Sequence, residues 1–107
     1  MSLVIRIELD ASQWKTGLDF YDALLTALGA PHWHGRSVDA LIDSMVYRDI
    51  NTIESPYTIA VTGADKMSAR AVSSMVQAIL ALGKAGADAA GIKFRTSPMT
   101  AEWVPDG

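Results

Sequence analysis

The chain has 107 residues, of which 50% are hydrophobic and 20% are charged, and this composition predicts one globular domain with a single core. The absence of cysteine excludes disulfides and thiolate metal sites. The formal net charge of -3 argues against binding nucleic acid through its phosphates, and no apolar run approaches the roughly 18 residues that span a bilayer. We therefore expect a cytoplasmic protein that binds neither nucleic acid nor membranes.

The first two expected elements are a strand and a helix. Residues 3–9 alternate between apolar and polar side chains, which predicts a strand with one buried and one wetter face. Residues 19–29 are expected to form a helix that ends at Gly29 and Pro31. The apolar stripe of this helix comprises Phe20, Leu24, Ala27 and Leu28.

A second helix is expected after Ser37, which is a typical N-cap residue. Asp39 and Asp43 fall on the flank of this helix, and two carboxylates at this i,i+4 spacing repel each other by roughly 0.2–0.5 kcal/mol. The helix dipole alone explains Asp39 in the first turn, but Asp43 lies too far along for that explanation. A cationic partner explains both. The expected buried side of the helix comprises Val38, Leu41, Ile42 and Met45.

The rest of the chain predicts a strand at 57–62, a helix capped by Ser68, and a third strand around Ile92 and Phe94. The third helix is expected to end at Gly83 and Gly86 and to bury Val72, Met75, Val76 and Ile79. The order of the elements implies parallel pairing through right-handed crossovers.

Charged residues stand at alternate positions of the first and third strands, which favours helices on one face of the sheet only. The prediction is a two-layer α/β fold in which a three-stranded parallel sheet, of order 1-2-3, has its helices packed on one face. Residues 1–96 are expected to form this domain. Residues 97–107 are expected to form a C-terminal tail that packs against the domain through Trp103.

Charge is unevenly distributed along the chain. Residues 1–59 contain eight acidic and four basic residues, whereas the remainder contains four acidic and five basic residues. An acidic half that includes Asp39 and Asp43 is typical of a protein that binds a basic protein, because long-range attraction speeds the encounter. A mildly acidic surface without a specific partner explains the charge equally well.

The segment 31–43 reads Pro-His-Trp-His-Gly-Arg-Ser-Val-Asp-Ala-Leu-Ile-Asp. Its Pro31, Trp33, Gly35, Asp39-Ala40-Leu41 and Asp43 resemble the core motif of the barstar family of ribonuclease inhibitors. The resemblance extends upstream through residues 19–24 and downstream through residues 55–59 and the helix before Gly86, and covers most of residues 3–96.

This resemblance implies the same small α/β fold and an inhibitor, or immunity protein, that plugs a nuclease active site with its second helix and the loop before it. Asp43 would occupy a phosphate-binding position with Asp39 as its neighbour, Trp33 would stack at the cleft, and Gly35 would let the loop approach closely. The implied partner is an extracellular-type basic ribonuclease or a related toxin. The expected partner-binding residues are Trp33, His34, Gly35, Ser37, Asp39, Asp43 and Tyr47.

The chain also departs from the family's pattern. Ser37 stands in place of asparagine, His34 in place of tyrosine, Ile42 in place of tryptophan, and Ala81 in place of an acidic residue. The loop from 46 to 55 is longer and contains Arg48. These departures leave the identity of the target open, including a protein that is not a nuclease.

Simpler structural roles are the alternatives for single residues. Trp33 is either a staple that fixes the loop to the core or an exposed interface anchor, and Tyr47 has the same two interpretations. Gly35 is expected to supply a turn backbone that other residues resist.

Catalysis is the competing class of function. His32 and His34 suggest a metal pair, but two ligands do not make a zinc site. If Asp39 and Asp43 acted as a general acid and a general base, the surroundings of one of them would have to raise the pKa of its carboxyl group. The flank of a surface helix does not provide such surroundings. No phosphate-binding loop, dinucleotide turn or nucleophile elbow is present. We therefore expect a protein that is not an enzyme and has no cofactor or metal.

Overall fold

The chain is described by a computed structural model that covers residues 5–47 and 50–97. Residues 98–107, with Trp103, and residues 48–49, with Arg48, lie outside this description. No helix among the described residues has the length and apolar character needed to cross a membrane. The elements in chain order are β1 (Ile5–Asp10), α1 (Gly17–Leu28), α2 (Val38–Leu41), η1 (Ile42–Val46), β2 (Tyr57–Thr62), η2 (Ala64–Lys66), α3 (Ala69–Lys84) and β3 (Ile92–Ser97).

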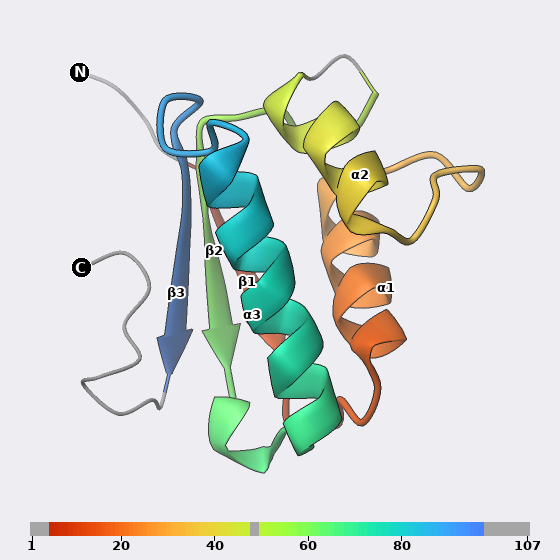
Figure 1. Cartoon of the computed structure of the whole chain (residues 1–107), viewed down its shortest axis with the longest axis vertical. Helices are drawn as coiled ribbons and strands as arrows, with labels where there is room; N and C mark the ends of the chain where they lie inside the picture. Colours follow the sequence, from red (N-terminus) through yellow and green to blue (C-terminus); the bar gives the residue numbers. More distant parts are fainter. Residues whose placement is uncertain (1–4, 48–49, 98–107) are drawn as a thin grey trace.

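The three strands form one parallel sheet in the order β1-β2-β3 (Figure 1). The register brings Ile7, Ile59 and Phe94 side by side, and all three are buried. The alternate positions of β1 and β3 carry exposed charged residues, so the helices cover one face of the sheet and the other face meets solvent. The predicted two-layer α/β fold, with its strand order, is confirmed. The exposed charged residues of the open face are Arg6, Glu8, Lys93 and Arg95.

Helix α1 begins and ends through local interactions. The carboxylate of Asp19 accepts the backbone N–H groups of Lys15, at 2.7 Å, and Thr16, at 3.0 Å, and these bonds lower its pKa. Gly29 ends the helix at φ +70°, and a Cβ at this position would lie 2.6 Å from the Cβ of Thr52. The predicted end is therefore confirmed. The buried residues of the helix are Phe20, Leu24, Leu25 and Leu28.

Helix α3 differs from its prediction in the side that it buries. Ser68 caps it as expected, because its hydroxyl accepts the N–H of Ala71 at 3.1 Å. The fully buried stripe consists of Ala71, Met75, Ala78 and Leu82. Val72, Val76 and Ile79 are only half-buried, so predicting them as core was wrong. Small alanine side chains let α3 pack closely against α1 and the sheet, and the larger branched residues lie at the border of that contact.

Candidate functional site

The segment that follows α1 carries the expected site, which consists of the connection 30–37, α2, η1 and Tyr47. Leu41 and Met45 anchor the helical part because both are fully buried in the core. Val38 and Ile42 are half-buried beside them. Burial of Leu41 and Met45 is therefore confirmed, whereas full burial of Val38 and Ile42 was wrong, and the opposite side of the helix faces solvent.

Asp39 and Asp43 lie on that solvent-facing side, and both are exposed. Within residues 5–47 and 50–97, neither carboxylate forms an ion pair. The nearby cation Arg36 instead places its Nε 3.3 Å from Oδ1 of Asp22 on α1. The two carboxylates thus remain available to a partner.

The second helix is not a uniform α-helix. After one turn of α2 the chain continues as the π-helical turn η1, in which the N–H of Tyr47 donates to the carbonyl of Ile42 at 3.2 Å. π-Helical turns of this kind are rare and occur frequently at functional sites. The sequence pattern predicted one continuous helix and did not reveal this widened turn.

Ser37 caps the helix, as expected, because its hydroxyl accepts the N–H of Ala40 at 3.1 Å. The cap holds the first turn, where Asp39 stands, in a defined orientation. A structural role is therefore established for Ser37, which was also expected to be a partner-binding residue.

His34 connects the loop to the helix. Its Nδ1 lies 2.7 Å from the carbonyl oxygen of Gly35, and its Nε2 lies 2.7 Å from the hydroxyl of Ser44. Because a carbonyl only accepts, Nδ1 donates to Gly35, and Nε2 lies within hydrogen-bond distance of the Ser44 hydroxyl. Both ring nitrogens are thus engaged within the chain, which argues against a metal pair with His32. No metal-binding cluster of three or more His, Asp or Glu side chains occurs in the described part of the chain.

Ser44 is the site residue that sequence reasoning missed. It is fully buried between Leu41 and Met45 along the helical segment, and it holds the loop through His34. The available signal was a polar residue next to the apolar side of an amphipathic helix, because a buried hydroxyl requires a hydrogen-bond partner.

The two aromatic residues of the site project into solvent. Trp33, before α2, and Tyr47, after η1, are each 68% exposed. Trp33 therefore does not staple the loop to the core, and the role of either residue as an interface anchor stays a prediction. Large aromatic side chains of this kind are enriched among the residues that dominate protein interfaces.

Gly35 does not have the expected backbone role. Its φ lies outside the left-handed region that favours glycine, and a Cβ at this position would lie 3.5 Å from the Cβ of Ala40, an ordinary contact. The prediction that other residues resist this backbone was wrong. The exposed position is compatible with close approach of a partner to the main chain.

A hollow of about 190 Å³ lies beside the loop, and its lining includes His32, His34 and Arg36. Asp39 and Asp43 do not line it. An acid and base pair would need both carboxylates in a shared recess that removes water from one of them. Both side chains instead lie exposed on a helix surface, which suits contact with another macromolecule better than catalysis.

Comparison with known proteins supports the same fold. No curated protein sequence matches the chain significantly. The family model described as barstar (barnase inhibitor) matches residues 4–97. Because this match spans most of the 107 residues and the fold agrees with the one that the family implies, the chain belongs to the barstar family.

Proposed function

We propose that this protein is a stoichiometric inhibitor of a basic ribonuclease, or of a related toxin, and that α2, η1 and the preceding loop enter the enzyme's active site. The observation that carries the proposal is the pair Asp39 and Asp43, exposed and without an ion pair among the described residues. Membership in a family described as a barnase inhibitor supports the same function.

In this mechanism the carboxylates occupy the positions of RNA phosphates. A ribonuclease holds phosphates with arginine or lysine, and a fixed carboxylate makes short, charge-assisted hydrogen bonds with the same groups. Asp43 is the principal contact and Asp39 its neighbour. Trp33 precedes the two aspartates in the chain and Tyr47 follows them, and both side chains contribute apolar contact area.

Rigidity of the segment supports affinity. The buried Leu41 and Met45, the Ser37 cap and the contact between His34 and Ser44 hold the acidic side chains in place before binding. Little conformational entropy is then lost when the complex forms. His34 and Ser37 therefore act mainly as positioning residues, and Gly35 lets the loop approach the enzyme closely.

Titration of secreted basic ribonucleases with the purified protein tests the proposal. The expected result is loss of RNA cleavage at a one-to-one ratio, and a lower affinity for Asp43→Ala. The matched control is Asp65→Ala, which removes an exposed carboxylate from η2 at the opposite end of the molecule (Figure 1). Equal inhibition by Asp43→Ala and the unchanged protein would refute the mechanism. Capture of a partner that is not a nuclease or toxin would instead favour a different interaction module of the same fold.

A further inference from the structure

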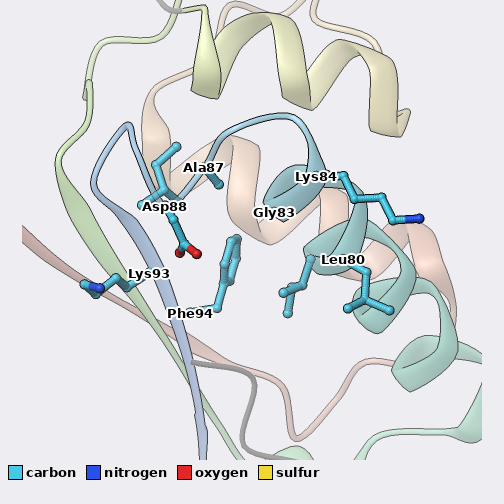
Figure 2. Close-up of a pocket in the computed structure, with 9 residues that line it drawn as sticks. Leu80, Gly83, Lys84, Ala87, Asp88, Lys93 and Phe94 are labelled. Atoms are coloured by element: carbon cyan, nitrogen blue, oxygen red, sulfur yellow. The ribbon is translucent and has the colours of Figure 1, made fainter. Parts of the chain in front are cut away.

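Lysine and arginine are distributed unevenly around the molecule. Figure 2 shows Lys84 and Lys93 at a groove of about 520 Å³, which is lined by residues of α3, of β3 and of the turn between them. None of its lining residues belongs to the proposed binding segment, residues 30–47. That segment contains a single arginine, Arg36, and no lysine. The position of this guanidinium group therefore affects the charge that a basic enzyme meets.

Arg36 lies close in sequence to the exposed carboxylates. It directly precedes the N-cap Ser37 and stands three positions before Asp39. Charges on a protein surface act on each other over a screening length of about 8 Å at physiological ionic strength. A guanidinium group that turned towards Asp39 would offset part of its negative charge, and it would repel the lysines or arginines of a ribonuclease.

In the structure, Arg36 is instead directed towards α1. Its Nε lies 3.3 Å from Oδ1 of Asp22, and the two side chains are 51% and 56% exposed. Both residues line the hollow of about 190 Å³ beside the loop, whereas neither Asp39 nor Asp43 lines it. The ion pair thus borders a surface to which the two acidic side chains of the site do not belong.

We infer that Asp22 is a positioning residue, which pairs with Arg36 and so keeps the guanidinium group away from Asp39 and Asp43. This pairing preserves the negative charge that the inhibitor presents. The inference rests on the proposed function, because the charge serves only a cationic partner. An exposed ion pair is weak, so the expected effect on affinity is roughly three- to fivefold, with little effect on folding.

A cycle of variants of the full chain tests the inference against a basic ribonuclease that the unchanged protein inhibits. Asp22→Asn is expected to raise the inhibition constant roughly three- to fivefold, because it releases Arg36 towards the acidic side chains. Arg36→Gln should inhibit at least as strongly as the unchanged protein, and the double variant should match Arg36→Gln. Asp22→Glu retains a carboxylate for Arg36 and should keep the original constant.

Two controls separate the position of the charge from its amount and from folding. Asp65→Asn removes an equal charge from an exposed position of η2, and it should raise the inhibition constant less than Asp22→Asn does. Urea unfolding of each variant is expected to give a free energy close to that of the unchanged protein, because the ion pair is exposed.

The position of Arg36 can also be measured without an enzyme. A cationic nitroxide in solution collects near negative surface charge and broadens the amide NMR signals there. The broadening at Asp39 and Asp43 is expected to decrease in Asp22→Asn and to recover when Arg36→Gln is added. If the chain inhibits no ribonuclease, the proposed function fails, and this measurement still shows whether Asp22 controls the position of Arg36.

Four results would overturn the inference. The first is equal inhibition by Asp22→Asn and the unchanged protein, and the second is nitroxide broadening that Asp22→Asn leaves unaltered. The third is weaker inhibition by Arg36→Gln, because the ion pair would then act by fixing the loop or by contacting the enzyme. The fourth is an equal loss on adding Asp22→Asn to Arg36→Gln, because Asp22 would then act through its own charge.

Discussion

The carboxylates of α1 and those of the α2–η1 segment have opposite relations to the rest of the chain. On α1, Asp19 accepts two backbone N–H groups and Asp22 pairs with Arg36. On the second segment, Asp39 and Asp43 are exposed and form no ion pair within the part of the chain that the structure describes. Acidic residues close in sequence thus differ in their surroundings: the first pair contacts groups of its own chain, and the second is exposed as the proposed inhibitory mechanism requires.

The largest effect is expected for Asp43→Ala. In the complex, the Asp43 carboxylate is expected to be buried against a cation of the enzyme, and its removal would leave that cation unpaired. We therefore expect the binding free energy to weaken by about 3 kcal/mol, which raises Kd roughly a hundredfold. The free energy of unfolding should change little, because the side chain forms no ion pair with the described residues. Isothermal titration and urea unfolding measure the two quantities. An equal loss of affinity in Asp65→Ala would show that general charge, and not position, is responsible.

The second prediction concerns the rate of association. Raising the ionic strength from about 0.05 M to about 0.5 M is expected to slow binding by roughly tenfold, because salt screens the attraction between the acidic segment and a basic enzyme. The double variant Asp39→Asn, Asp43→Asn should show a flatter dependence in stopped-flow measurements. Glu8→Gln removes a charge from the open face of the sheet and should retain the original slope.

The third prediction addresses the support beneath the acidic segment. Ser44→Ala removes the hydroxyl that hydrogen-bonds to Nε2 of His34, and we expect a loss of about 1 kcal/mol in the free energy of unfolding. Affinity should fall by less than for Asp43→Ala, since the carboxylates remain. Ser73→Ala, at an exposed position of α3, is the control in urea unfolding. A variant of Ser44 as stable as this control would show that the contact does not hold the loop.

The smallest effect is expected for Asp19, and it depends on pH. Its pKa is lowered by the hydrogen bonds from the N–H groups of Lys15 and Thr16. A carboxylate with a lowered pKa in the folded state contributes stability above its ordinary pKa, and this contribution is lost as the pH falls through the folded-state value. Asp19→Asn should therefore reduce the loss of stability on acidification. Thermal unfolding between about pH 2 and pH 6 measures the change, and an unaltered profile would contradict it.

Much of the fold was open to prediction because its signals are local. Alternation in the strands, glycine at the end of α1 and the caps Ser37 and Ser68 each depend on residues within a few positions of one another. The stripe of α3 was less predictable, because half-burial of Val76 and full burial of Ala78 depend on how closely α1 and the sheet approach.

Periodicity and capping act through neighbouring residues, so they were enough to predict the strands, the main helices, the parallel order and the place of Asp39 and Asp43 on one side of a helix. The folded structure was needed to show that Arg36 pairs with Asp22, that Ser44 contacts His34, and that the two carboxylates form no ion pair among the described residues. Those pairings join residues 10 and 14 positions apart, whose meeting depends on the packing of the loop against the helices.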